Sequence, residues 1–313
     1  MKVTSNGGEF EVVINEPAGV KVTPDTPTVL LIMGLGMQLI AWPIDFVNAL
    51  THAGYRVVRL DNRDIGLSHK TSAAMPSLVW MALRHRVRLP VTAAYTLRDM
   101  VEDTGGVLEA LNISRCHVIG VSMGGMIAQG LASHHPDRVA SLTSIMSTTG
   151  ARGLPQATPK AAMALLSRPK SKLRDDIITH FVRVLGIIGS PKFPMPEADV
   201  RQRIGEAFDR SFYPAGTIKQ MAAIMASGDR SDEVRRISVP TLVIHGNADP
   251  LVPLQNGADT ANKVEDSEYT VIDGMGHDLG ALAAVTERVL LFLQKHTRPR
   301  ESSTFDASLR EKP

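Results

Sequence analysis

A serine lies in an unusual setting in the segment GVSMGG, which spans residues 120–125. The apolar run before it predicts a buried strand over 115–120, and the helical spacing after it predicts a helix over 123–134. The serine must then occupy a strand-to-helix turn with almost no connecting residues. Such a turn favours positive φ at Ser122, which is costly for a residue with a Cβ. We expect the strained turn to expose the hydroxyl beside the N-terminus of the helix, where it can act as a nucleophile.

A serine is a poor nucleophile unless a base takes its proton and a third group orients that base. The segment VIHGNADPLVP places Asp249 in the loop after a predicted strand, and VIDGMGHDLG places His277 in the loop after the next one. The carboxyl ends of parallel strands gather at one edge of an open α/β sheet, so Ser122, Asp249 and His277 can meet there. Their order along the chain is that of hydrolases with a nucleophile elbow.

An acyl-transfer site also needs hydrogen-bond donors for the oxyanion that develops on the attacked carbonyl group. The segment LLIMGLGMQ ends a predicted strand in a glycine-rich turn at the same edge of the sheet. The motif pairs the N–H after the nucleophile with one from this loop, so we expect the backbone donors to be Met123 and Leu35.

Other polar residues near the predicted site have simpler interpretations. Asp273 and Asp278 are alternatives for the acid, but Asp278 adjoins the histidine and would point elsewhere, and Asp273 suits a turn at the strand end. Asp61, Arg63 and Ser68 fit a hydrogen-bond network that braces a loop near the site better than they fit catalysis.

Several methionines fall in or beside the loops at the predicted active edge, and the candidates for a substrate pocket are Met33, Met37, Met146 and Met275. Methionine is flexible and polarisable, so a pocket lined by it would be apolar and adaptable. The alternative is that these side chains fill gaps in the core. No Lys or Arg stands within the triad motifs, so we expect neutral, mainly apolar substrates, with short-to-medium chains or bulky hydrophobic groups.

The elements that must position these residues alternate along the chain. Strands are predicted at 9–14, 28–33, 55–60, 115–120, 138–146, 239–245 and 267–272, and helices at 43–53, 96–112, 123–134, 254–264 and 280–296. This alternation is typical of an α/β fold with a doubly wound, mostly parallel sheet. The first strands lack an intervening helix, so we expect them to form an antiparallel hairpin at the edge of the sheet.

The alternation stops between residues 150 and 236, where helical patterns follow one another without a strand. We predict an inserted helical cap over 150–236 and an α/β core formed by 1–149 and 237–297. The polar, aperiodic residues 298–313 predict a flexible tail. The segment 75–90 mixes apolar and basic residues and predicts an amphipathic surface helix near the cap, with contact to a membrane surface as the alternative.

The composition argues against several classes of protein. The 313 residues carry 34 Lys and Arg against 32 Asp and Glu, so the charge balance does not favour binding to nucleic acid. The single cysteine, Cys116, lies in a predicted buried strand, which favours an inert core thiol. No run approaches the roughly 18 apolar residues of a membrane span, and the N-terminus lacks the apolar stretch of a signal peptide. We therefore expect a cytoplasmic protein. Beyond the predicted triad, no cluster of His, Asp and Glu has the spacing of metal ligands, so we expect no metal site. A homodimer stays open.

Taken together, the motifs resemble those of a known family. IMGLGMQLIAWP, RLDNRDIGLSH, HVIGVSMGGMIAQGLA, LVIHGNADPLVP and GMGHDL stand in the order found in α/β-hydrolases. The chain resembles bacterial carboxylesterases close to the aclacinomycin methylesterase group. The resemblance implies an α/β-hydrolase fold with a cap, and a serine esterase without a cofactor that uses Ser122, Asp249 and His277 as its catalytic triad.

The predicted function is the hydrolysis of a small-molecule carboxylic ester through an acyl-enzyme. Haloalkane dehalogenases and epoxide hydrolases of this fold use an aspartate as nucleophile, so Ser122 argues against both. Lactonases, C–C bond hydrolases, cofactor-free haloperoxidases and proline iminopeptidases share the triad and stay open as alternatives, although the predicted cap shows no acidic cluster placed to hold the free amino group of a peptide. A non-catalytic ligand receptor is a further alternative, although such proteins usually lose a member of the triad.

Overall fold

The computed structural model describes residues 1–297 except 18, 20, 24, 75–76, 78–79, 82, 85–88 and 90. The predicted tail 298–313 and much of the segment 75–90 lie outside the described residues, so those two predictions stay untested.

The strands of the described chain form a single sheet, and their bounds are β1 (Lys2–Ser5), β2 (Gly8–Asn15), β3 (Thr28–Ile32), β4 (Arg56–Leu60), β5 (Cys116–Val121), β6 (Val139–Ile145), β7 (Thr241–Gly246) and β8 (Glu268–Ile272). Their order across the sheet is β1-β2-β4-β3-β5-β6-β7-β8. All pairings from β4 to β8 are parallel, whereas β1–β2 and β2–β4 are antiparallel. The prediction of a mostly parallel α/β sheet is confirmed.

The edge hairpin forms differently from the sequence expectation. It consists of β1 and β2, and β1 is a strand of only four residues that the sequence pattern did not indicate. The predicted strand 28–33 lies inside the sheet instead, where β3 pairs in parallel with both β4 and β5. The physical reason is that β3 is buried along its whole length, as a strand covered on both faces must be.

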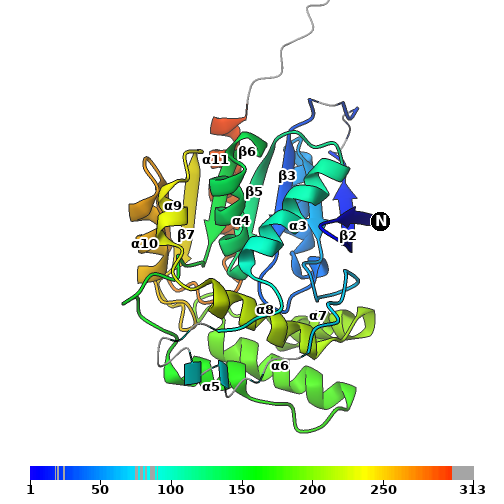
Figure 1. Cartoon of the computed structure of the whole chain (residues 1–313), viewed down its shortest axis with the longest axis vertical. Coiled ribbons are helices and arrows are strands. Elements are labelled where there is room, and N and C mark those ends of the chain that lie inside the picture. The colour runs from blue at the N-terminus through cyan, green and yellow to red at the C-terminus, as the bar shows by residue number, and fades with distance from the viewer. Residues whose placement is uncertain are drawn as a thin grey trace, which may run out of the picture.

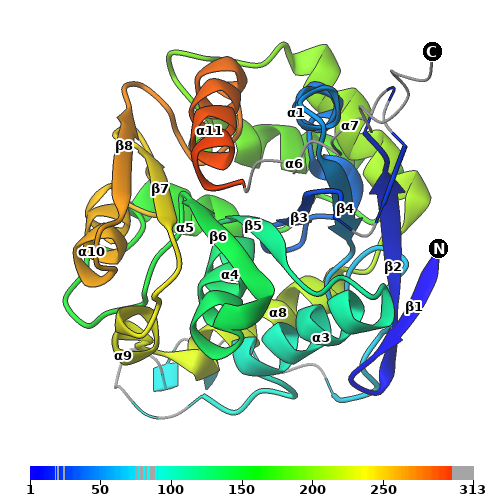
Figure 2. The ribbon, with the colours of Figure 1, turned by 90° about the horizontal axis from the view of Figure 1, so that it is seen from above.

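Helices cover both faces of this sheet (Figure 2). The helices of the core are α1 (Ile44–His52), α3 (Leu97–Ala110), α4 (Met123–His134), α10 (Gln255–Lys263) and α11 (Leu282–His296), with short 3₁₀ turns η1 (Leu39–Ala41) and η2 (Pro136–Arg138). α1 and α11 cover one face, and α3 and α4 cover the other (Figure 2). Successive residues of β3 point into opposite layers: Leu30 packs with the α3–α4 cluster and Leu31 with the α1–α11 cluster.

The helices between β6 and β7 are α5 (Pro159–Leu166), α6 (Arg174–Ile188), α7 (Glu197–Arg210), α8 (Pro214–Ser227) and α9 (Ser231–Arg235). Figure 1 shows α5 to α8 together beyond one end of the sheet, where they form a layer of their own. α9 instead contacts α4 and α10 of the core. The treatment of 150–236 as a separate cap domain stays a prediction.

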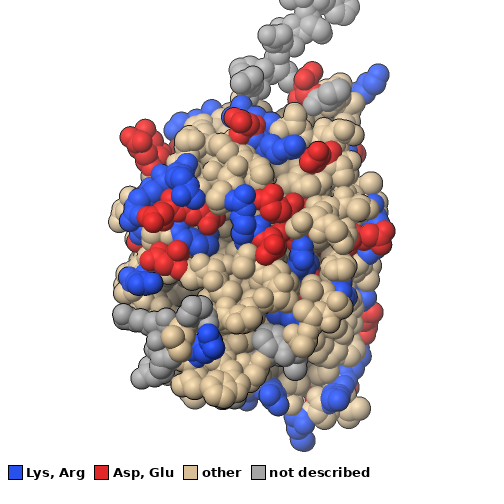
Figure 3. Space-filling view, viewed as in Figure 1, with Lys and Arg blue, Asp and Glu red and all other residues tan. Residues whose placement is uncertain are grey.

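Charged side chains of both signs are interspersed over the upper part of the face drawn in Figure 3, whereas its lower part is largely uncharged and shows few acidic groups. None of the helices in the described part of the chain combines the length and apolar character needed to cross a bilayer. Cys116 is buried at the start of β5, and burial raises the pKa of its thiol to about 12, so the prediction of an inert core thiol is confirmed.

A second buried titratable group stands beside it on β5. The ring nitrogens of His117 lie 2.8 Å from Ser141 Oγ and 3.2 Å from Thr297 Oγ1, and its ring packs edge-on against Tyr55. Burial lowers the pKa of His117 from 6.5 to about 4, because the charged imidazolium would lose its hydration there. The histidine is therefore neutral in the folded protein near neutral pH.

This low pKa predicts a pH dependence of folding. The unfolded chain binds a proton at His117 near pH 6.5 and the folded chain does not, so stability falls as the pH drops from about 6.5 towards 4. At about 1.4 kcal/mol per pKa unit, the expected contribution of this one site is about 3 kcal/mol. Urea denaturation at pH values between 7.5 and 4 measures it, with His117→Gln as the non-titrating comparison. Parallel pH profiles for the two proteins would contradict the prediction.

Candidate active site

Ser122 alone connects β5 to α4, since β5 ends at Val121 and α4 begins at Met123. Its backbone has φ 55° and ψ −119°, so the positive φ that the sequence predicts is confirmed. The turn closes only because two glycines flank it. A Cβ at Gly120 would lie 2.1 Å from the carbonyl oxygen of Gly124, and a Cβ at Gly124 would lie 2.1 Å from that of Ile32. The tight turn therefore holds the serine side chain at the carboxyl end of β5.

The structure brings the three predicted triad residues into one chain of hydrogen bonds. His277 Nε2 lies 3.0 Å from Ser122 Oγ, and His277 Nδ1 lies 2.7 Å from Asp249 Oδ2. The loops after β7 and β8 deliver the acid and the histidine, because both strands end at the same edge as β5. With Nδ1–H donated to the carboxylate, Nε2 carries the lone pair that can accept the serine proton.

The Asp249 carboxylate is oriented by backbone groups of its own loop. Its Oδ1 accepts N–H bonds from Leu251 at 2.9 Å and from Val252 at 2.8 Å, which leaves Oδ2 directed at His277. The side chain is fully buried, so its charge interacts with the imidazole in a medium of low dielectric constant.

A second histidine lies beside the same carboxylate but is placed differently. His245 Nε2 lies 2.7 Å from the carbonyl oxygen of Val252 and 3.6 Å from Asp249 Oδ2. Burial lowers the pKa of His245, which favours the neutral ring. Because a carbonyl oxygen can only accept, the Nε2 that faces Val252 carries the proton. His245 thus packs behind the acid, while His277 is the histidine that reaches the serine.

The glycine-rich loop after β3 lies directly against the serine. A Cβ at Gly34 would be 3.3 Å from Ser122 Cβ, and Met37 N–H donates to the carbonyl oxygen of Gly34 at 3.2 Å, closing a turn. Gly36 has φ 70°, and its N–H donates to Gln220 Oε1 at 2.9 Å. Leu35 stands between these two anchored glycines. Its role as an oxyanion donor, together with Met123 at the first position of α4, stays a proposal.

Asp61 braces the loops beside the site, as the sequence indicated. Its Oδ1 accepts the N–H of Leu39 at 2.7 Å, and its Oδ2 accepts bonds from Leu67 N–H at 2.8 Å and Arg210 at 2.7 Å. Because Arg210 belongs to α7, this fully buried carboxylate also ties the helical layer to the core.

The two other predicted bracing residues make comparable bonds. Ser68 Oγ donates to the carbonyl oxygen of Asp61 at 2.6 Å. Arg63 Nε donates to Asp103 Oδ2 at 2.7 Å, and its guanidinium also lies over the ring of Tyr95. The prediction of a structural hydrogen-bond network is confirmed for Asp61, Arg63 and Ser68.

The four methionines proposed as pocket residues lie in different surroundings. Met33, Met146 and Met275 are almost fully buried and pack in the cluster between the sheet and α1 and α11, whereas 41% of Met37 is exposed. The buried three have the contacts expected of core residues. Met37, in the loop beside the serine, is the one whose side chain is free to meet a ligand.

The loops after β3, β5, β7 and β8 form the candidate site, and we call them the catalytic loops. Two residues that no sequence motif marks contact them. Gln220 of α8 is fully buried, receives the Gly36 N–H and donates to the carbonyl oxygen of Arg63 at 2.7 Å. Ser190, just after α6, accepts the N–H of Gly276 at 2.9 Å. No local pattern marks either residue, because each acts on a loop far away in the sequence.

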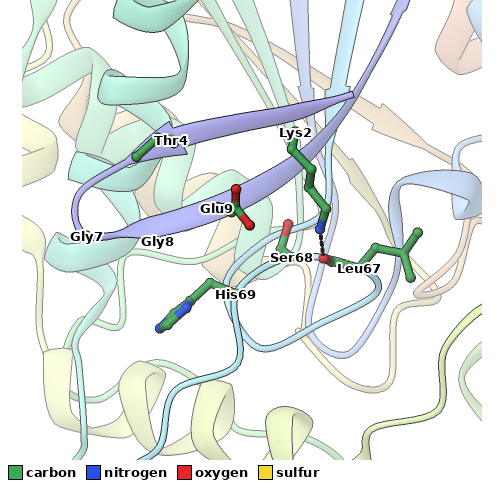
Figure 4. Close-up of a pocket in the computed structure, with 8 residues that line it drawn as sticks. All are labelled: Lys2, Thr4, Gly7, Gly8, Glu9, Leu67, Ser68 and His69. Carbon is green, nitrogen blue, oxygen red and sulfur yellow. Dashed lines mark hydrogen bonds between the residues drawn. The ribbon is translucent and has the colours of Figure 1, made fainter.

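Two surface hollows lie away from these loops. One, of about 410 Å³, lies between the β1–β2 hairpin and residues 67–69 (Figure 4). Two of its polar side chains are already used within the protein, since Lys2 donates to the Leu67 carbonyl and Ser68 to that of Asp61. The other, of about 700 Å³, lies between residues 151–154, α9 and α10. Neither hollow is lined by a member of the triad.

The fold agrees with the comparison to known families. The model of the alpha/beta hydrolase fold family matches residues 27–282. The chain belongs to this family. It is therefore a hydrolase, and the resemblance noted from the sequence motifs is confirmed.

Relatives of this α/β-hydrolase act on several kinds of substrate. A rhodomycin D methylesterase from Streptomyces peucetius is 24% identical over 295 residues, which cover 88% of this chain and 92% of the relative. A 2-hydroxy-6-oxononadienedioate/2-hydroxy-6-oxononatrienedioate hydrolase from Paraburkholderia phymatum is 26% identical over 280 residues, 88% of each chain. The enol-lactonase from Burkholderia xenovorans LB400 has a similar structure, with a TM-score of 0.71 and 22% identity, covering 94% of this chain and all of that one. A thermophilic esterase from Thermogutta terrifontis gives a TM-score of 0.66 at 19% identity, covering 95% and 99%. The structural likenesses show the shared fold.

Proposed function

We propose that this α/β-hydrolase is a serine esterase that cleaves carboxylic esters through an acyl-enzyme. The observation that carries the proposal is the continuous hydrogen-bond chain from Ser122 through His277 to Asp249, at 3.0 and 2.7 Å, on a strained strand-to-helix turn. This is the arrangement in which a base can take the serine proton as the oxygen attacks a carbonyl carbon.

In the first half of the proposed reaction, Ser122 Oγ attacks the ester carbonyl while His277 Nε2 accepts its proton. Asp249 holds the imidazole and stabilises the cation that forms on it. The backbone N–H groups of Leu35 and Met123 hold the negative oxygen of the tetrahedral intermediate. The imidazolium then protonates the leaving alcohol, and the acyl group stays on the serine.

In the second half, His277 removes a proton from water, which attacks the acyl carbonyl. The second tetrahedral intermediate collapses, the protonated imidazole returns the proton to Ser122 Oγ, and the carboxylic acid leaves. The proposed mechanism draws only on protein groups and water.

The charges around the site support a neutral substrate. Three cations belong to loops or helices that border the catalytic loops, and each is paired with a carboxylate: Arg63 with Asp103, Arg210 with Asp61, and Lys219 with Asp64. Binding a negatively charged substrate through any of them would compete with an existing ion pair, and two of these pairs involve fully buried carboxylates. We therefore propose neutral, mainly apolar esters, of short-to-medium acyl chain or with a bulky hydrophobic alcohol.

A substrate panel tests this proposal. Within a series of neutral esters, kcat/KM is expected to rise with each buried methylene, by up to about 0.8 kcal/mol or roughly fourfold, until the pocket is full. The panel should also contain charged esters, amides and lactones matched in size to the neutral esters. The Ser122→Ala variant is assayed alongside as the blank. If a charged ester or an amide gave the highest kcat/KM, the proposed substrate class would be contradicted. A clear preference for lactones would favour the lactonase alternative.

A further inference from the structure

The end of α6 runs beside the loop that carries the catalytic histidine. The backbone N–H of His277 donates to the carbonyl oxygen of Ile188 at 2.7 Å. A Cβ at Gly276 would lie 2.3 Å from the carbonyl oxygen of Gly189, so the two backbones are in direct contact. The position of the histidine loop thus depends on a segment of the helical layer and not only on β8.

Within this contact, the side chain of Ser190 bonds to both neighbours of His277. Its Oγ accepts the N–H of Gly276 at 2.9 Å and donates its proton to Asp278 Oδ1. Its backbone N–H also donates to Asp278 Oδ2, at 3.0 Å. Ser190 is 4% exposed, so water cannot readily replace these bonds. A hydroxyl is suited to this place, because it can donate one bond and accept another at the same time.

These bonds also explain the orientation of Asp278, which the sequence offered as an alternative for the acid of the triad. Its Oδ1 accepts the N–H of Gly280 at 2.9 Å in addition to the bond from Ser190. The carboxylate is therefore directed at the end of α6 and at its own loop, while Asp249 is directed at the imidazole.

We propose that Ser190 is a positioning residue for His277. It acts through Gly276 and Asp278 and keeps Nε2 at 3.0 Å from Ser122 Oγ. Because a displacement of about 1 Å at reacting groups can cost a factor of about 10² in rate, loss of this clamp should appear in the chemical step. The inference rests on the proposed function, in which His277 is the base.

The test compares Ser190→Ala with Ser190→Thr, which keeps the hydroxyl. The matched control is Ser167→Ala, because Ser167 is a second serine of the helical layer and its Oγ donates to the Ala164 carbonyl at 2.6 Å, away from the histidine loop. The assay uses a p-nitrophenyl ester for kcat and KM. A fluorophosphonate probe gives the rate of serine labelling and the number of active sites, and thermal unfolding gives the stability of each variant.

Ser190→Ala is expected to lower kcat per active site by about 10², with little change in KM and a parallel loss in labelling rate. Ser190→Thr should recover most of that loss, and Ser167→Ala should behave as the wild type. A Ser190→Ala protein with wild-type kcat per titrated site would overturn the inference, even if fewer sites were folded. A failure of the proposed function would give a different result: Ser122→Ala would then hydrolyse the ester as fast as the wild type.

Should Ser190→Ala not fold, Asp278→Ala provides a second route to the same clamp. It removes the acceptor of the Ser190 hydroxyl but leaves the bond from Gly276, so it is expected to lower kcat per site by less than Ser190→Ala while leaving KM unchanged. Unchanged kcat in a folded Asp278→Ala protein that unfolds at a lower temperature would indicate a purely structural link, and would overturn the inference.

Discussion

Ser122→Ala and His277→Ala are each expected to lower kcat by about 10⁴–10⁶, and the double variant should be little slower than either one. The reason is that the serine oxygen attacks only while the imidazole takes its proton, so removing either partner removes the same step. Initial rates on a p-nitrophenyl ester measure the effect, and fluorophosphonate labelling should be lost in both single variants.

Asp249→Asn belongs to the same experiment and should lose somewhat less activity. The amide can still accept the N–H groups of Leu251 and Val252, so the fold should survive, but it no longer stabilises the imidazolium. Circular dichroism and thermal unfolding of each variant establish that the loss is chemical. Full additivity of the Ser122 and His277 substitutions would refute the assignment of a triad.

Leu35→Pro should lower kcat by roughly 10² or more, because proline removes the backbone N–H that is the proposed oxyanion donor. Leu35→Ala keeps that N–H and shortens only the side chain, so it should mainly change KM and the preference among esters. The comparison of kcat between the two variants separates the backbone donor from the side chain.

Proline also restricts the backbone of a loop that is anchored at Gly36 through Gln220, so the variant needs a check on its structure. A melting temperature near that of Leu35→Ala shows that the loop tolerates the change. If such a folded Leu35→Pro protein kept normal kcat, the donor would have to be another N–H of residues 34–38.

Much of the fold and the meeting of Ser122, Asp249 and His277 could be predicted because the signals are local. Strands and helices of the core lie within two residues of their predicted bounds, since alternation and helical spacing report which side of each element is buried. The turn at Ser122 was predictable for the same reason, because the glycines at 120 and 124 stand within two residues of the serine they accommodate. The order of β7 and β8 then placed Asp249 and His277 at the edge where β5 ends.

What the sequence alone did not show depends on pairings between distant segments. β1 is too short for its pattern to stand out, and the sheet position of β3 follows from its burial on both faces. The sequence places the four candidate methionines at the same edge of the sheet. Only side-chain packing decides that Met33, Met146 and Met275 are buried and that Met37 is exposed.

The supports of the catalytic loops are the clearest case of this kind. Ser190 meets Gly276 across 86 residues of sequence, and Gln220 meets Gly36 across 184. Each bond forms only once the helical layer has packed on the core. From the sequence alone, a serine or glutamine could bond to many partners, and no periodic pattern indicates which partner it will meet. The sequence thus determined the chemical groups of the site and the elements that carry them, whereas tertiary packing decided which side chains hold those groups in place.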